Sequence, residues 1–230
     1  PILLQFGISP ASAVGTDLLY AAITKSGGIH VHHKKQNIDW RITLFLSFGS
    51  IPAALLTLWF LHSSGLDTET VNRVIKKSLG WAMLFTALAI LFKQKIMDYS
   101  HRNDVWITRM SPRHQDIATV IVGLILGAVV TLTSIGAGAL GTVVLFLLYP
   151  LLPTVRLVGT EIAHAVPLTL VAGLGHASFG NVDWGLLVNL LIGSLPGIYI
   201  GSHLAHRAAD KYLRPALAAM MMYAGSRLVL

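Results

Sequence analysis

The sequence predicts an all-α, polytopic helical membrane protein with two inverted repeats and Gly-rich broken helices. Three observations support this fold class. Residues 117–155 contain no Asp, Glu, Lys or Arg, and neither do residues 42–61 and 162–182. A bilayer core needs about 20 apolar residues per helix, so these runs are long enough to span it. In addition, a set of motifs recurs later in the chain, and the basic residues gather between the apolar runs.

The repeat is visible as three motifs, each of which returns 144 residues later without a gap. V-G-T-D at 14–17 returns as V-G-T-E at 158–161, N-I-D-W at 37–40 as N-V-D-W at 181–184, and G-S-I-P at 49–52 as G-S-L-P at 193–196. A long repeat in an apolar chain is typical of transporters whose two related halves surround a central site.

The apolar runs predict helices, and the repeat divides them into two halves. Helices are expected over 12–31, 41–62, 70–92, 113–133, 157–178, 185–206 and 211–229, with a half-helix over 142–152 and the remnant of another over 1–8. Residues 1–92 form a first repeat that lacks a counterpart of about 113–144, residues 93–112 a cytoplasmic connecting loop, and residues 113–230 the second repeat. We therefore expect the first repeat to be N-terminally incomplete, missing one span and a glycine loop.

Basic residues give the predicted helices a direction. The connections 32–41, 93–113 and 207–214 are rich in Lys and Arg, as cytoplasmic loops are, whereas 179–184 has neither. Since 179–184 is the repeat partner of a basic connection, the two halves are expected to lie in opposite senses across the membrane. The basic cluster 73–77 then lies on the outer side, which departs from the tendency of basic residues to lie on the cytoplasmic side. Parallel repeats therefore stay open as an alternative.

Composition excludes several classes of function. The net charge is +7, but the basic residues lie between apolar runs, so a nucleic-acid partner is not expected. There is no cysteine, which excludes disulfides and thiol chemistry, and no cofactor is expected. The chain shows no nucleophile–base motif and no H-E-x-x-H helix, so we expect no catalytic residues and no enzyme. It also shows no ATP-binding motif, so transport would use an ion gradient, a proton gradient or the substrate's own gradient.

Residues 134–141, S-I-G-A-G-A-L-G, interrupt the longest charge-free run. Their glycines spell the dinucleotide fingerprint G-x-G-x-x-G, but the strand and βαβ unit that this fingerprint requires are missing. Non-helical backbone at membrane depth survives only where it is buried or lines a wet cavity. Freed N–H groups and a helix N-terminus, expected at Thr142, would face an anion. Close helix packing through small residues is the alternative.

The glycine-rich break, the proline-bearing half-helix and the doubled motifs V-G-T-[DE], N-[IV]-D-W and G-S-x-P resemble the sulfite exporter TauE/SafE family of membrane transporters. The resemblance covers essentially the whole chain. It implies a bacterial inner-membrane carrier for small sulfur-containing anions, such as sulfite, thiosulfate or organosulfonates. Family members that take up thiosulfate use cysteines, which this chain lacks, so the resemblance does not imply that route here.

An ionisable group at membrane depth costs about 3 kcal/mol, so it usually has a function or a partner. Lys25 is the only Lys or Arg well inside a predicted helix. The predicted substrate-binding residues are Ser134, Gly136, Gly138, Gly141, Thr16, Thr160, Lys25, His32 and His176. The proton-coupling candidates are Asp17, Glu161 and His164, the hinge candidates are Pro52 and Pro196, and no metal ligand is predicted. Helix capping, packing and solvated surface positions are the alternatives for these residues.

These observations favour a secondary transporter for small, sulfur-containing anions that works by alternating access in the cell (inner) membrane. Its expected partners are the anion, a coupled proton or ion, and the lipid bilayer. A His-dependent metal or cation permease, an intramembrane enzyme and a non-transporting assembly factor are the alternatives. The doubled broken helix favours transport, and the scarcity of acids, 10 in the chain, disfavours a cation as substrate.

Overall fold

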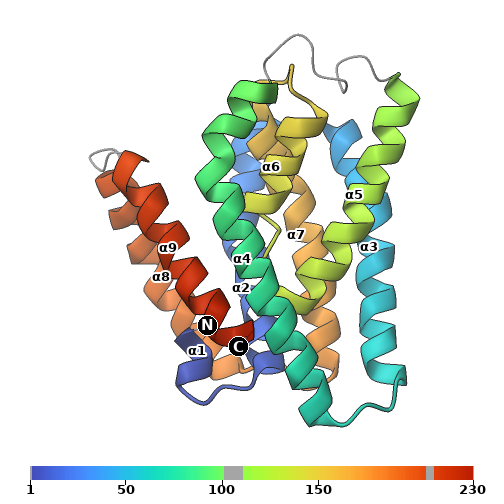
Figure 1. Ribbon diagram of the computed structural model, residues 1–230, viewed down its shortest axis with the longest axis vertical. Helices are drawn as coiled ribbons and strands as arrows, with labels where there is room; N and C mark the ends of the chain where they lie inside the picture. Colours follow the sequence, from blue (N-terminus) through green and yellow to red (C-terminus); the bar gives the residue numbers. More distant parts are fainter. Residues whose placement is uncertain (1, 101–110, 206–209, 230) are drawn as a thin grey trace.

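The computed structural model describes residues 2–100, 111–205 and 210–229, and every element in these ranges is a helix (Figure 1). The elements are α1 (Ile2–Gln5), α2 (Pro10–Lys34), α3 (Trp40–Ser63), α4 (Thr68–Ser100), α5 (Pro112–Thr133), α6 (Ala139–Leu148), α7 (Thr154–Ser178), α8 (Trp184–Ala205) and α9 (Asp210–Val229). The predicted all-α fold class is confirmed.

Several of the described helices are able to cross a bilayer. Four segments are long and apolar enough: Trp40–Ser63, Thr68–Lys95, Pro112–Thr133 and Thr154–Ser178. Apolar side chains also face outward, since Phe48 and Trp59 on α3 are 69% and 66% exposed. Such a surface suits lipid rather than water. The prediction of a polytopic helical membrane protein is confirmed.

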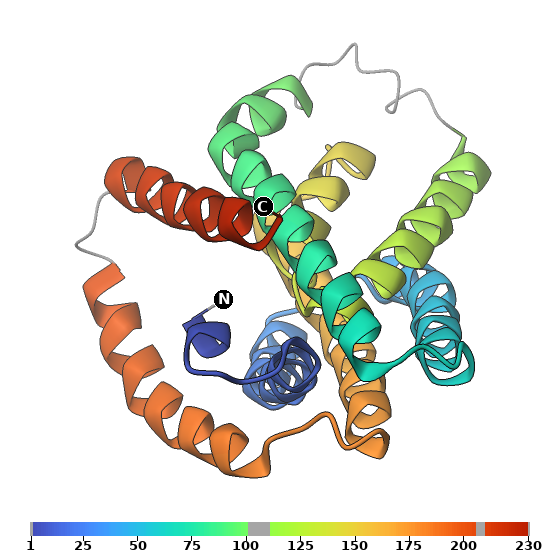
Figure 2. The ribbon, with the colours of Figure 1, turned by 60° about the horizontal axis from the view of Figure 1, so that its bottom comes forward.

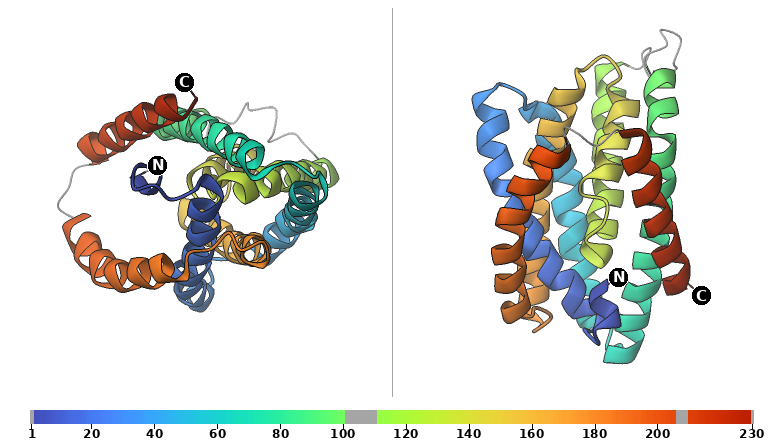
Figure 3. Two further views of the ribbon diagram at one scale, coloured as in Figure 1. Left: turned by 90° about the horizontal axis from the view of Figure 1, so that it is seen from below. Right: turned by 90° about the vertical axis from the view of Figure 1, so that its left-hand side faces the viewer.

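Most of the helices run between two ends of the bundle in alternating directions (Figure 1). α2 and α7 lie side by side and run in opposite directions (Figures 1 and 3). The α2–α3 connection, the end of α4 and the start of α5 lie at one end, whereas the α3–α4 and α7–α8 connections lie at the other (Figure 1). Lys34, Arg41 and Arg113 therefore share the end opposite the α7–α8 connection, which contains no Lys or Arg. The orientation in a membrane stays a prediction.

Equivalent residues set the ends of equivalent helices. α2 and α7 begin and end 144 residues apart, and α3 and α8 begin at the same offset. Asp39 caps α3 by accepting the N–H of Ile42 on Oδ1 at 3.3 Å, and Asp183 caps α8 by accepting that of Leu186 at 2.9 Å. The two N-x-D-W motifs therefore provide the N-caps of α3 and α8.

Two helices differ from their predicted bounds by more than three residues at one end. The half-helix expected over 142–152 is α6, which starts directly after Gly138 and stops before Pro150. Proline lacks an N–H group and disfavours helical backbone in the preceding residue, so the helix has to end there. α4, expected over 70–92, continues to Ser100 because residues 93–95, Lys-Gln-Lys, are good helix formers and no Gly or Pro follows.

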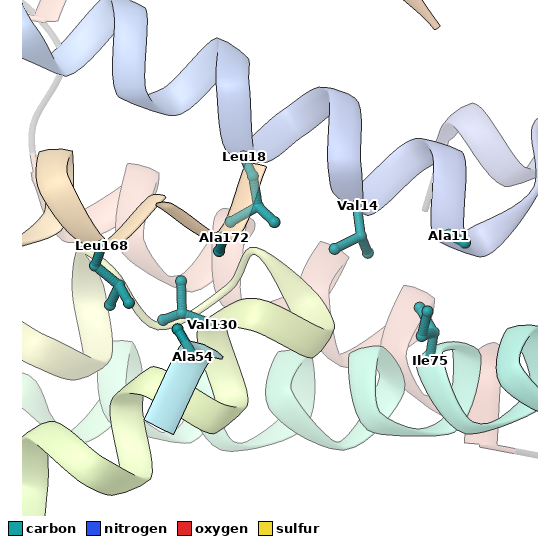
Figure 4. Packing of buried hydrophobic residues seen from close by; sticks show 8 residues of the cluster. All are labelled: Ala11, Val14, Leu18, Ala54, Ile75, Val130, Leu168 and Ala172. Carbon is teal, nitrogen blue, oxygen red and sulfur yellow. The ribbon is translucent and has the colours of Figure 1, made fainter. Parts of the chain in front are cut away.

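The buried core joins both halves of the chain. One cluster contains Ala11, Val14, Leu18, Ala54, Ile75, Val130, Leu168 and Ala172, each at most 4% exposed (Figure 4). These residues come from α2, α3, α4, α5 and α7, so the first and second halves share this core. Seen along the bundle, α8 and α9 lie at its edge, where α9 packs on α4 (Figures 2 and 3).

Candidate functional site

A break between α5 and α6 forms the backbone of the site. It covers residues 134–138 at mid-height of the bundle, where the chain turns back (Figure 1). Ser134 ends α5 in a left-handed conformation, φ 57°, and its N–H donates to the Val130 carbonyl at 2.7 Å. Gly136 has φ 120°, which side-chain-bearing residues rarely adopt, and its carbonyl accepts the N–H groups of Gly138 and Gly141. Helix resumes at Ala139, three residues before the expected Thr142.

Lys25 reaches this break from α2. Its Nζ donates a hydrogen bond to the Ala137 carbonyl and lies 3.8 Å from the place that a Cβ on Gly138 would take. Among the described residues, no carboxylate forms an ion pair with it. The Lys25 ammonium therefore lies at the N-terminus of α6, which is the positive end of the helix dipole. Both the ammonium and this helix end favour a bound negative charge.

Two backbone amides beside this cation are unused. Gly138, the N-cap of α6, has no side chain to accept them. In the described part of the chain, the N–H groups of Ala139 and Leu140 donate to no acceptor. The N–H and hydroxyl groups of Thr142, by contrast, both donate to the Gly138 carbonyl, at 2.9 and 2.6 Å. Free amides and an ammonium at one helix start suit a small anion.

Two carboxyl groups flank Lys25, one from each half of the chain. Asp17 lies eight residues earlier on α2, about 12 Å along its axis, and neighbours the Ser134 hydroxyl. Glu161 on α7 is 3% exposed, and a Cβ on Gly141 would lie 3.2 Å from its Oε1. Lys25 acts electrostatically on both carboxyl groups. Ser134 Oγ and Glu161 Oε1 are buried and have no hydrogen-bond partner among the described residues.

His164 adds a buried polar pair near this group. It is 1% exposed, and its Nε2 shares a hydrogen bond of 2.8 Å with Ser50 Oγ from α3. Lys25 acts electrostatically on His164 as well. Sequence reasoning left Ser50 out of the site, although its place in a G-S-x-P motif beside Pro52 was an available signal. Pro52 and Pro196 lie inside α3 and α8, and their role as hinges stays a prediction.

The two predicted threonines lie at the crossing of α2 and α7 rather than beside Lys25. Thr16 Oγ1 accepts the N–H of Asp183, and Thr160 Oγ1 accepts the N–H of Asp39, each at 2.9 Å. The bonds are reciprocal, since each threonine holds the cap of a helix from the other half. This gives both threonines a structural role, and a role in binding substrate stays a prediction.

The paired histidines lie at the two ends of the same crossing. His176 is buried, and its Nε2 donates a hydrogen bond of 2.9 Å to the Thr131 carbonyl. It packs against Gly15, whereas His32 packs against the equivalent Gly159. The structure therefore places both histidines against backbone, and their predicted contact with substrate is not tested by this arrangement.

Other parts of the described chain add no group to this site. A cavity of about 690 Å³ lies between α1, α4 and α9 and is lined mainly by apolar residues, including Leu4, Ile8, Met83 and Met220. None of the predicted site residues lines it. Within residues 2–100, 111–205 and 210–229, no three His, Cys, Asp or Glu side chains are grouped so as to hold a metal ion.

The chain has relatives in a known family of membrane proteins. The profile of the family described as sulfite exporter TauE/SafE matches residues 1–228. The chain belongs to the sulfite exporter TauE/SafE family. The resemblance seen in the motifs is thereby confirmed, and the protein is a multi-pass member of a membrane transporter family.

Curated relatives of the chain are probable transporters. The probable membrane transporter protein YjnA of Bacillus subtilis strain 168 is 36% identical over 229 residues, which cover 100% of this chain and 89% of that protein. The probable membrane transporter protein YdhB of the same strain is 28% identical over 232 residues, 96% of this chain and 88% of that protein. No solved structure matches the chain.

Proposed function

We propose that this TauE/SafE family member is a secondary transporter for small, sulfur-containing anions, such as sulfite or an organosulfonate. The observation that carries the proposal is the position of Lys25 Nζ at the start of α6, beside the unused amides of Ala139 and Leu140. Hydrogen bonds that involve a charged group contribute about 1.5–3 kcal/mol each, which suits reversible binding of a small ion.

The donor set fits the oxygens of an oxidised sulfur atom. Sulfite and sulfonate groups each present three oxygens, which can accept from the Lys25 ammonium and from two adjacent amides at once. The chain has no cysteine, so it would hold the anion by charge and hydrogen bonds rather than through a thiol. The description of the family, sulfite exporter, supports the same class of substrate.

The two halves would provide alternating access to this site. α2 and α7 run in opposite directions and are joined by reciprocal Thr–Asp contacts, as expected of inverted repeats. Rocking one half against the other would expose Lys25 to each side of the bilayer in turn. We further propose that the protein works in the inner cell membrane and moves its substrate without chemical change.

Anion binding by the purified protein tests this proposal. Sulfite, sulfate, methanesulfonate and taurine are titrated into wild type and Lys25→Ala. We expect about a 30-fold loss of affinity in Lys25→Ala, because one charge-assisted hydrogen bond of about 2 kcal/mol is removed. Lys77→Ala, on the exposed face of α4, is the matched control and should bind as the wild type does. Unchanged anion affinity in Lys25→Ala would contradict the proposed site.

A further inference from the structure

Glu161 is buried beside the proposed anion site, but the proposal so far gives it no role in binding the anion. Its carboxyl group is 3% exposed and borders the first turn of α6 at Gly141. Its Oε1 has no hydrogen-bond partner among the described residues. A carboxylate oxygen without a partner beside a helix N-terminus occupies the kind of position that a bound anion would take.

Few charged or titratable groups surround Glu161. On α7 itself these are Arg156, His164 and His176. The helices packed against α7 carry Asp17, Tyr20, Lys25, His30, His32, His33 and Lys34 on α2, Asp39, Arg41 and His62 at the cap and along α3, and Arg113, His114 and Asp116 on α5. His32 lies against Gly159, two residues before Glu161. Arg156 pairs with Asp39 at 3.0 Å, and the three groups on α5 lie in its first turns, away from the break. The break and α6 carry no titratable side chain. Lys25 is therefore the cation that acts on Glu161.

Asp17, the repeat counterpart of Glu161, has different surroundings. It neighbours Ser134, which follows the last residue of α5. The C-terminal end of a helix presents carbonyl groups and disfavours an anion, whereas the N-terminal end presents amides. Lys25 acts on both carboxyl groups, but Glu161 borders the start of α6, where an anion bound at Lys25 would lie, whereas Asp17 lies near the end of α5.

We propose that the Glu161 carboxylate competes with the substrate anion for Lys25 and the start of α6, so that each anion binds together with one proton. This inference rests on the proposed function. With Glu161 ionised, an arriving anion would place a second negative charge near one ammonium in a medium of low dielectric constant. Protonation of Glu161 removes that repulsion. The protein is then a proton–anion symporter.

The step involves only a proton transfer. A proton from water or buffer forms an O–H bond on one oxygen of Glu161, and the conjugate base stays in solution. The Lys25 ammonium and the amides of Ala139 and Leu140 then donate to the anion. No bond of the anion breaks, and no group is oxidised or reduced.

Proton counting during anion binding tests this inference. The full chain is titrated with methanesulfonate, which stays singly charged, in calorimetry buffers that differ in ionisation enthalpy. The wild type should take up about one proton per anion. Because the complex holds one proton more than the free protein, its affinity should fall up to about tenfold for each unit of rising pH.

Substitutions at Glu161 assign the proton. Glu161→Gln keeps the shape of the side chain and should bind methanesulfonate without proton uptake and without pH dependence. Glu161→Asp keeps a carboxyl group and should retain the uptake. Glu69→Gln, at an exposed position on α4, is the matched control and should keep the wild-type proton count. If Glu161→Gln fails to fold, a wild type that takes up no proton still overturns the inference.

The outcomes separate this inference from the proposed function. If the wild type binds none of the anions, the proposed function is overturned and this inference with it. If the wild type binds methanesulfonate without proton uptake, or if Glu161→Gln retains the uptake, only the coupling to Glu161 is overturned. In that case the anion site at Lys25 stands.

Discussion

The helix pairs α2–α3 and α7–α8 agree in how they are held together. Thr16 binds the cap of α8 and Thr160 binds the cap of α3, at the same distance of 2.9 Å. Gly15 allows the Asn181 carbonyl of the α7–α8 connection to approach α2 closely. Gly159 allows the Asn37 carbonyl of the α2–α3 connection to approach α7 in the same way. The most visible repeated motifs, V-G-T-[DE] and N-x-D-W, therefore build the frame of the molecule.

The same two pairs differ in the groups that bear charge near the break. The counterpart of Lys25 is Thr169, which is buried and donates to the Ala165 carbonyl of its own helix at 2.8 Å. The counterpart of His164 is Tyr20. The unshared Lys25 and His164 lie at the candidate site together with Glu161 and Ser50, which belong to the repeated motifs. In this molecule the repeat accounts for the crossing, and the site combines repeated residues with departures from the repeat.

Substituting the crossing glycines should produce the largest effect and should do so equally in both halves. A Cβ at Gly15 would overlap the Asn181 carbonyl oxygen and lie 2.9 Å from His176 Cβ. A Cβ at Gly159 would overlap the Asn37 carbonyl oxygen. We expect Gly15→Ala and Gly159→Ala each to lower the free energy of unfolding by about 3 kcal/mol, because backbone atoms cannot move aside as side chains can. Thermal unfolding in detergent measures this.

Gly27→Ala provides the control on the same helix. No atom lies within 4 Å of the place its Cβ would take. An alanine there should stabilise α2 by about 0.5–1 kcal/mol, since glycine in a helix interior is costly. If Gly15→Ala is as harmless as Gly27→Ala, the crossing is not tight. If Gly15→Ala and Gly159→Ala differ widely, the two ends of the crossing are not equivalent.

The sequence was sufficient to predict the frame but only part of the site. Charge-free runs and a fixed offset reveal the spans and the repeat, because these depend on local composition. The contact of Lys25 with the Ala137 carbonyl joins residues 112 positions apart, and it depends on how the break folds. The start of α6 was misplaced by three residues because glycine backbone conformation decides it. Ser50 was missed because its partner, His164, belongs to the other half.

Substitutions of Ser50 and its repeat counterpart Ser194 should have the next largest effect on stability, and they should differ from each other. Ser50→Ala would leave Nε2 of the buried His164 without its partner, at a cost of about 1–3 kcal/mol. Among the described residues, Ser194, the repeat counterpart, donates only to the Leu191 carbonyl of its own helix, at 3.1 Å. Ser194→Ala should therefore change the free energy of unfolding by less than about 0.5 kcal/mol. Equal losses in the two variants would show that the Ser50–His164 bond contributes nothing specific.

The smallest expected difference lies between the two capping aspartates. Asp39→Asn and Asp183→Asn both keep a good N-cap, so helix capping should hardly change. Asp39 additionally pairs with Arg156 at 3.0 Å, with the two side chains 21% and 43% exposed, whereas the counterpart of Arg156 is Ser12. Asp39→Asn should cost about 0.5 kcal/mol more than Asp183→Asn, as partly exposed ion pairs do.

A double-mutant cycle with Arg156→Gln measures this difference. The pair is partly exposed, so salt should screen it, and the difference between Asp39→Asn and Asp183→Asn should vanish at high ionic strength. A difference that persists in high salt, or that remains in the Arg156→Gln background, would mean that Asp39 acts through another contact. The two ends of the crossing would then differ in their packing as well as in their charges.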